Sequence, residues 1–344
     1  MHGLHGQVTR AADILKLTPA GLYCEAGDFY VDPVRKVAHA VITHGHSDHA
    51  RRGHDAVLAT AETLDVMAVR YGDKFAGSRQ TARFGETIAM GEARVTLKPA
   101  GHVIGSAQVL IEVKGARVVV SGDYKRARDP TCPAFEPIQC DVFITEATFG
   151  LPIFRHPPAE GEVAKLLHSL ALFPERAHFV GAYSLGKAQR LIALLREAGY
   201  DRPIFVDPAT ARLCAVYAAH HVELGALLPL DGQIANALAG KIVIAPPSAR
   251  DLFAEADAEP VTSFASGWMR TRKRAQQGGG ELPLIISDHA DWDELTQTAR
   301  EIGPSELWIT HGEEAALIHW ATSHGMAARP LAIKGYSEEE TAPP

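Results

Sequence analysis

The sequence predicts an α/β protein that consists of a sheet-based core interrupted by an inserted α/β domain. Two observations lead to this prediction. Short runs rich in Val and Ile recur along the chain, and several of them end in Asp, Glu or His, as strands that lead into functional loops do. Between Glu146 and His289, strand-like and helix-like segments alternate, which is typical of a parallel sheet with crossover helices. A chain of 344 residues is long enough for two domains.

The predicted core strands come before and after the insertion. In chain order they end at Asp32, His44, His102, Asp123, Glu146, His289 and His311. Sheet proteins build active sites in loops on one edge of a rigid sheet, so we expect these side chains to meet.

The inserted domain has its own strand and helix signals. Residues 178–199 predict a strand, a glycine-bearing turn and an amphipathic helix, and residues 202–221 repeat that order. Residues 240–247 and 259–268 add strands, and the glycine-rich segment 276–283 resembles a linker. We therefore predict a first core part at 1–150, the inserted domain at 151–280, a second core part at 281–335 and a flexible tail at 336–344.

Composition and charge limit the kind of protein and the cellular compartment that we expect. The formal net charge of −7 argues weakly against a protein that coats nucleic acid, although Arg270–Arg274 form a local basic run. No stretch reaches the roughly 18 apolar residues of a membrane span, and the amino terminus lacks a signal-peptide pattern, so we expect a cytoplasmic protein without membrane association. The four cysteines form no CxxC pair, which disfavours a structural zinc knuckle.

The segment HGHSDH is the strongest chemical signal. It places His44, His46, Asp48 and His49 within six residues, and imidazole and carboxylate ligands suit borderline metals such as zinc. Alternate residues of an extended loop can face one ion, while Asp48 and His49 can turn toward a second.

Other strand-end residues complete the predicted metal site. His102 is a further ligand, and Asp123 is the best-placed carboxylate to bridge two ions about 3.5–4 Å apart. His311 is the remaining candidate for the second ion. We expect Asp32 to accept a hydrogen bond from a ligand imidazole and so fix its tautomer.

These residues carry a resemblance. Asp32, the HxHxDH segment, His102 and Asp123 resemble motifs one to four of the metallo-β-lactamase superfamily. Glu146, His289 and His311 resemble the three added motifs of its β-CASP nuclease branch, which includes Artemis, RNase J and the cleavage and polyadenylation endonuclease.

The resemblance implies a four-layer αββα sandwich with an inserted α/β β-CASP cap domain. It also implies that one ion is held by His44, His46 and His102, the other by Asp48, His49 and His311, and that Asp123 bridges them. The ions would be zinc or manganese, and availability often decides between them.

Two features of the resemblance point to different substrates. Residues 145–158, 181–191 and 263–269 look most like bacterial DNA ligase-associated exonucleases, a group often labelled mRNA 3′-end processing factors. The third added motif has a histidine, His311, as in the RNA-processing members, whereas Artemis-type DNA nucleases usually have valine at that position. We expect a DNA exonuclease of a repair pathway, with a DNA ligase and a helicase as candidate partners. An RNA-processing nuclease is the nearest alternative, and a small-molecule hydrolase is a more distant one.

The mechanism follows from the same residues. A hydroxide held between two ions is a nucleophile at neutral pH. His289 is the candidate general acid for the departing oxygen, and an acidic partner such as Glu146 would orient it and keep it protonated. Asp48 and Asp32 belong to the same predicted catalytic set. The alternative for Glu146 is a buried carboxylate with structural hydrogen bonds only.

Two further sets are candidates for binding phosphate. Ser184, Gly186 and Lys187 open a predicted helix, and helix amino termini bind anions, although a plain helix start explains them equally well. The second set is Ser266, Gly267 and Arg270. The basic run that begins there is either a solvated helix face or part of a substrate groove, which would make binding salt-dependent.

Overall fold

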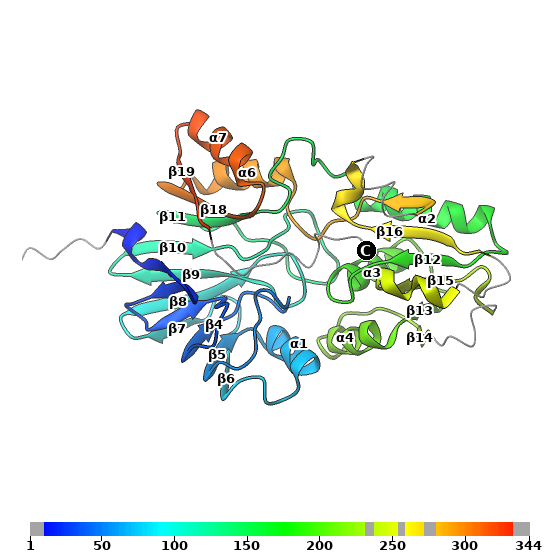
Figure 1. Ribbon diagram of the computed structural model, residues 1–344, viewed down its shortest axis with the longest axis horizontal. Helices are drawn as coiled ribbons and strands as arrows, with labels where there is room; N and C mark the ends of the chain where they lie inside the picture. The colour runs from blue at the N-terminus through cyan, green and yellow to red at the C-terminus, as the bar shows by residue number, and fades with distance from the viewer. Residues whose placement is uncertain (1–9, 231–236, 254–258, 272–279, 333–344) are drawn as a thin grey trace, which may run out of the picture.

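The structure is a computed structural model that describes residues 10–230, 237–253, 259–271 and 280–332. It has two lobes side by side along its long axis, the core and the cap (Figure 1). The amino-terminal segment and the last helices and strands of the chain belong to the core lobe, and the middle of the chain forms the cap.

The first core sheet has six strands in chain order. They are β1 (Leu15–Thr18), β2 (Gly21–Cys24), β3 (Phe29–Val31), β4 (His39–Val41), β5 (Ala56–Ala59) and β6 (Ser78–Thr81). The first three are antiparallel and the later ones pair in parallel. Helix α1 (Ala61–Tyr71) follows β5 and begins where the side chain of Thr60 accepts a hydrogen bond from the Thr63 amide.

The second core sheet has seven strands. Their order is β19 (Ala327–Pro330), β18 (Glu306–Gly312), β11 (Val142–Ala147), β10 (Ala116–Val120), β9 (Ala107–Val113), β8 (Ala93–Pro99) and β7 (Thr87–Met90). Helices α6 (Trp292–Ile302) and α7 (Glu314–Ser323) lie on its outer face (Figure 1). Asp291 and Glu294 form a capping box that begins α6, and Gly303 ends the helix in a left-handed conformation.

The two core sheets pack face to face. Val31 and Val41 of the first sheet and Val109, Val118 and Ile144 of the second belong to one buried apolar cluster. A second cluster joins α1 to the first sheet, and a third joins α6 and α7 to the second. The layers are therefore helix, sheet, sheet, helix, which confirms the predicted αββα sandwich.

The cap is a parallel α/β domain, which confirms the second part of the predicted fold. Its strand order is β14 (Leu227–Pro229), β13 (Ile204–Val206), β15 (Ile242–Ala245), β12 (His178–Gly181), β16 (Val261–Ala265) and β17 (Leu282–Leu284), all paired in parallel. Its helices are α2 (Ala159–Leu172), α3 (Lys187–Glu197) and α4 (Pro208–Ala219). Strands β12, β15 and β16 are buried throughout, as strands covered on both faces are.

Short 3-10 segments complete the described structure, at Ala11–Asp13, Pro247–Phe253 and Gly267–Arg270. Strand β17 pairs with β16, so Leu282–Leu284 belong to the cap sheet, beyond the boundary that the sequence predicts at residue 280. A short apolar run does not itself indicate which of two sheets it will join. Residues 276–279 of the predicted linker, Arg272–Arg274 of the basic run and the predicted tail lie outside the described residues.

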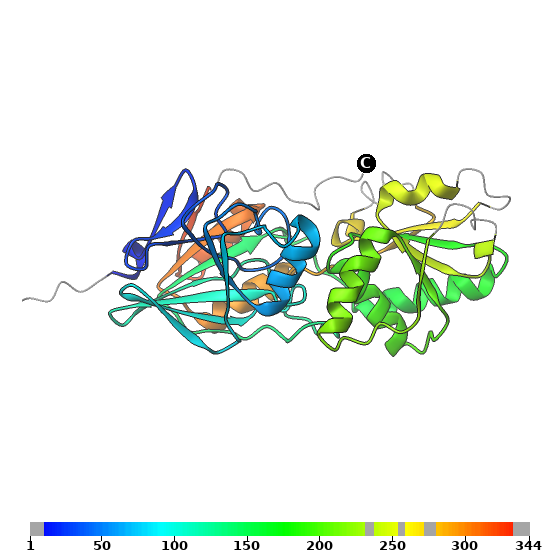
Figure 2. The ribbon, with the colours of Figure 1, turned by 90° about the horizontal axis from the view of Figure 1, so that it is seen from below.

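The two lobes meet along α1 of the core and α4 of the cap, which lie side by side in both views (Figures 1 and 2). His220, at the end of α4, contacts Asp65 of α1 at 2.8 Å. Among the described residues, no helix has both the length and the apolar character needed to cross a membrane.

Candidate metal centre

The HGHSDH loop follows β4 and is fixed by Asp32, the residue after β3. The buried Asp32 carboxylate accepts hydrogen bonds from the Thr43 amide at 2.8 Å, from Thr43 Oγ1 at 2.6 Å and from His49 Nδ1 at 2.8 Å. Asp32 has a φ of 43°, a left-handed conformation that is uncommon outside glycine. The hydrogen bond between Asp32 and His49 Nδ1 orients the His49 ring, so that His49 Nε2 faces the other candidate ligands.

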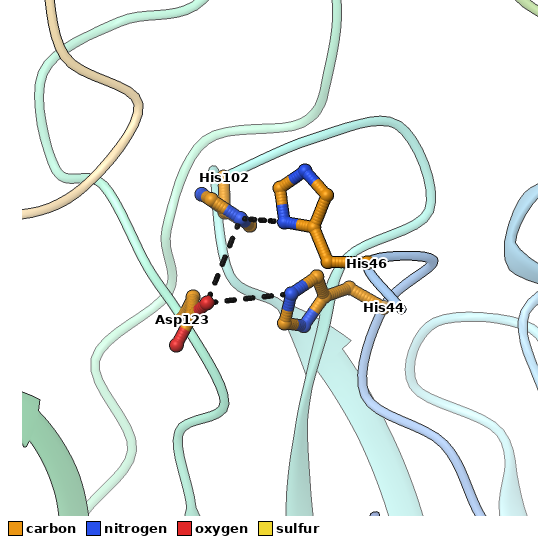
Figure 3. Close-up of side chains that lie close together, drawn as sticks. All are labelled: His44, His46, His102 and Asp123. Carbon is orange, nitrogen blue, oxygen red and sulfur yellow. Dashed lines mark hydrogen bonds and ion pairs between the residues drawn. The ribbon is translucent and has the colours of Figure 1, made fainter. Parts of the chain in front are cut away.

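The first group of candidate ligands consists of His44, His46, His102 and Asp123, whose side chains converge (Figure 3). His46 Nδ1 lies 3.0 Å from His102 Nε2, and Asp123 Oδ2 lies 3.4 Å from His44 Nε2 and 3.9 Å from His102 Nε2. Ligands at bond lengths of 2.0–2.1 Å around a tetrahedral ion are about 3.3 Å apart. The spacing of these donor atoms therefore fits one divalent ion.

The protonation of the first group also suits a metal. Burial lowers the pKa of His44 well below its ordinary value and that of His102 to about 3, so both rings are neutral at neutral pH. Burial alone would raise the pKa of Asp123, but His49, His311 and His44 hold it well below its ordinary value. His44 Nε2 is buried and has no hydrogen-bond partner among the described residues. A buried anion among neutral imidazoles is a donor set that can bind a metal ion.

A second group shares Asp123 with the first. Asp123 lies 3.4 Å from His49 Nε2 through Oδ2 and 3.5 Å from His311 Nδ1 through Oδ1. Asp48 approaches this group through His49, with 3.6 Å between Asp48 Oδ2 and His49 Nε2. Burial disfavours a charge on His49, but Asp123 and Asp48 raise its pKa well above the ordinary value. A metal ion bound here would therefore displace a proton from His49.

His289 and Glu146 lie beside both groups. His289 Nδ1 is 3.0 Å from Glu146 Oε2 and 3.2 Å from Oε1, and the Tyr124 amide donates to Glu146 Oε1 at 2.8 Å. Asp123, Glu146 and His289 offer ligand atoms within 4.8 Å of one another. The residues predicted for metal binding and proton transfer are thus gathered at one point, although they come from both core sheets and from the loop after β17.

Several known proteins are similar to this chain. No family model matches the chain. It is 27% identical over 317 residues to a probable DNA ligase of Opitutus terrae, covering 90% of this chain and 30% of that protein. It is 35% identical over 159 residues to the endoribonuclease ysh1 of Emericella nidulans, covering 43% of this chain and 18% of that protein.

Two further similarities concern the branch and the fold. The cleavage and polyadenylation specificity factor 73 of Drosophila melanogaster is 30% identical over 151 residues, which cover 41% of this chain and 22% of that protein. A crystal structure of a protein of unknown function from Enterococcus faecalis superposes with a TM-score of 0.60 at 14% identity, covering 86% of this chain and 80% of that one. The fold and these relatives confirm the resemblance to the β-CASP branch of the metallo-β-lactamase superfamily. It spans less than a third of each of the three curated relatives named above.

The first predicted phosphate-binding set lies at the start of α3. Lys187 is fully buried, and its Nζ lies 2.6 Å from Asp288 Oδ1. Gly186 precedes it with a φ of 84°, and its amide donates to Gln189 Oε1 at 2.8 Å. Ser184 is half-buried and lines a cleft beside α1. A role in phosphate binding stays a prediction for these residues, because protein groups already contact Lys187 and Gly186.

The second predicted phosphate-binding set, Ser266, Gly267 and Arg270, already contacts other groups of the protein. The Ser266 hydroxyl accepts a hydrogen bond from the Trp268 amide at 3.3 Å, and Arg270 Nε donates to the Arg155 carbonyl at 3.2 Å. A Cβ on Gly267 would lie 2.4 Å from the ring of Phe149. Phosphate binding here also stays a prediction.

A cleft that the sequence did not indicate opens between the lobes. Its volume is about 620 Å³, and its lining includes Ser47, Arg70, Tyr183, Ser184, Leu185 and Arg212. Arg212 is exposed and forms no ion pair with the described part of the chain. Arg70 sits on α1, where its Nη1 donates to the Gly45 carbonyl at 2.9 Å and so links the cleft to the HGHSDH loop. These arginines belong to otherwise ordinary helix faces, so no local pattern marked them.

Proposed function

We propose that the protein is a cytoplasmic two-metal-dependent DNA exonuclease that hydrolyses phosphodiester bonds during DNA repair. One observation carries the proposal. Two groups of largely buried imidazoles share the Asp123 carboxylate, and the paired His289 and Glu146 adjoin that carboxylate.

The proposed roles follow from the contacts. Two divalent ions, zinc or manganese, would when bound supply an activated water and neutralise charge on the phosphate. His44, His46 and His102 would hold one ion and Asp48, His49 and His311 the other, while Asp123 spans both groups.

The same residues provide a route for the proton. Glu146 holds Nδ1 of His289, so the proton that His289 gives to the departing oxygen is the one on Nε2. Glu146 is itself fixed by the Tyr124 amide, which keeps the ring of His289 in one orientation. Asp32 fixes the orientation of the His49 ring in the same way, by accepting a hydrogen bond from His49 Nδ1.

The cleft between the lobes is the proposed path of the substrate. Arg212 and Arg70 provide positive charge, and Tyr183 provides a ring on which a base can stack. The path passes Ser47, which belongs to the HGHSDH loop, and Leu185, which lies just before α3. A chain with a net charge of −7 can still bind a polyanion where its cations are gathered locally.

Two observations favour different substrates. The relative named as a probable DNA ligase aligns with 90% of the chain, which favours DNA and makes a DNA ligase, together with a helicase of the same pathway, a candidate partner. The relative named as an endoribonuclease aligns with 43% of the chain at higher identity, which favours RNA processing as the second candidate. The longer alignment includes the cap and the proposed path, and we therefore give DNA the preference.

The test compares end-labelled single-stranded DNA and RNA of one sequence, incubated with the purified protein and either zinc or manganese. We expect DNA to be shortened from one end, with labels at the 5′ and 3′ ends showing which, and covalently closed circular DNA to remain intact. Rapid cleavage of RNA with DNA untouched would favour the second candidate instead. Cleavage of the circles would show an endonuclease. Retention of the protein by an immobilised DNA ligase, measured against an unrelated protein on the same matrix, tests the proposed partner.

A further inference from the structure

The residues at the start of α3 and just before it reach from the cap into the candidate metal centre. We call Leu185, Gly186 and Lys187 the cap turn. The Leu185 carbonyl accepts a hydrogen bond from His46 Nε2 at 3.4 Å, and Lys187 forms its buried ion pair with Asp288 at 2.6 Å. All three residues of the turn are buried.

Two of the three histidines in the first group depend on these contacts. His46 faces the other ligands with Nδ1, so its Nε2 bonds to the cap turn directly. His102 faces them with Nε2, and its Nδ1 donates to the backbone carbonyl of Asp288 at 2.9 Å. Asp288 is the residue that Lys187 pairs with. His44 differs, because its Nδ1 lies 3.0 Å from Thr43 Oγ1, a group of the core.

Gly186 fixes how closely the turn approaches. A Cβ at this position would lie 2.4 Å from Cγ1 of Val103, the residue after His102, and 3.4 Å from Asp288 Oδ2. Val103 is itself buried, so it has little room to move aside. Only glycine allows the turn to sit against the loop that carries His102 at a φ of 84°.

We infer that the cap turn positions His46 and His102, so that docking of the cap and metal binding in the first group are energetically coupled. Partners of the non-ligating nitrogen set the orientation and basicity of a ligand imidazole, and their loss typically costs about 10–100-fold in metal affinity. Coupling is reciprocal, so a bound ion also holds the turn in place. The inference rests on the proposed metal site, and it assigns Lys187 and Gly186 as positioning residues.

The chain provides a matched pair of glycines for the test. Gly186 and Gly199 flank α3, and both have a φ of 84°, a value at which alanine is strained at either position. A Cβ on Gly199 would meet nothing within 4 Å. We expect Gly186→Ala to raise the dissociation constant for zinc about 10–100-fold, measured by competition with a chromogenic chelator, and Gly199→Ala to leave it unchanged.

A second pair tests the ion pair. Lys187→Met should weaken zinc binding in the same assay. Lys241→Met, in the same domain at a lysine without an ion pair to any described residue, should not. Thermal unfolding of the EDTA-treated proteins checks that each variant folds.

The wild-type protein supplies a readout that requires no variant. Hydrogen exchange at the first amides of α3 should slow when zinc is added, while amides near Gly199 should not change. Equal zinc affinity for Gly186→Ala and Gly199→Ala, or unchanged exchange in α3, would overturn the coupling although the metal site stands. If the wild-type protein binds no zinc or manganese at all, the proposed function fails and the coupling fails with it.

Discussion

Replacing Asp123 by Asn tests the sharing of one carboxylate between two metal groups. Asn keeps the size of Asp but is neutral and offers one oxygen, whereas the two Asp123 oxygens lie 3.4–3.9 Å from imidazole nitrogens of both groups. Three imidazoles, those of His44, His46 and His102, remain for the first ion, and three protein ligands suffice for a zinc site. In the second group the converging ligand atoms are those of His49, Asp123 and His311, so loss of Asp123 leaves only two of them in place.

The structure thus sets an expected magnitude for Asp123→Asn. Because losing a group that merely supports a ligand costs about 10–100-fold in affinity, losing the shared ligand should cost more than about 100-fold at the second site. That corresponds to about 2.7 kcal/mol or more. Zinc content measured by mass spectrometry after dialysis should fall from two ions to one for each chain.

The matched control is Asp201→Asn, at an exposed aspartate of the cap, which should keep both ions. Exonuclease activity on labelled DNA should be lost in Asp123→Asn and retained in the control. Two ions in Asp123→Asn at unchanged affinity would refute the bridging role, whatever the activity.

Three further predictions use other parts of the site. His289→Ala and Glu146→Gln should lower kcat, by about 10²–10⁴-fold for the former, with zinc content unchanged; a loss of zinc would mean that His289 binds metal instead. Burial lowers the pKa of His102 to about 3 and that of His156 to about 2, against 6.5 for an unperturbed ring. As pH falls below 6.5, these two imidazoles become protonated in the unfolded chain but stay neutral in the folded protein. The metal-free protein should therefore lose stability, by up to about 2 kcal/mol per group at pH 5. Urea unfolding of the EDTA-treated protein at pH 7.5 and 5 measures this, and His156→Phe should reduce the difference; an equal difference in that variant would contradict the assignment. Arg212→Ala should raise KM for DNA at low salt with kcat unchanged, and should lower the salt slope of binding by about 0.7; an unaltered slope would place the substrate elsewhere.

The local order of the fold and the metal ligands was accessible from the sequence because both depend on short-range patterns. Strand β10 contains the apolar run 118–120 and β11 the apolar run 142–144, and β12 followed by α3 shows the strand, turn and helix in sequence. The HGHSDH segment keeps its candidate ligands within one loop. The layer order of the core came from the resemblance, since periodicity does not tell which sheet a strand joins, as β17 illustrates.

The contacts that support the ligands were not accessible, because they join distant segments. Lys187 and Asp288 are 101 positions apart, and His102 lies 186 positions from the carbonyl that orients it. Helix starts with glycine and lysine bind phosphate in some proteins and merely begin a helix in others. The buried contact of Lys187 with a carboxylate distinguishes the two roles, and this contact is visible only in the folded structure. Arg70 and Arg212 could not be assigned to a cleft from the sequence for the same reason, because the segments that line it are far apart in the chain.

The division between the lobes bears on how substrate choice can be studied. All seven candidate metal ligands belong to the core: six lie on loops that follow strands of its two sheets, and His311 lies near the end of β18. The cap turn contacts this group through His46 and, by way of Asp288, through His102. In the proposed function, the core therefore specifies the metal chemistry of hydrolysis. The proposed substrate path also includes Tyr183, Ser184 and Arg212 of the cap. A preference for DNA or RNA must then arise largely from cap residues, so substitutions at Tyr183 and Arg212 should alter the ratio of DNA to RNA cleavage without altering zinc content. Substitutions in the cap turn should alter both.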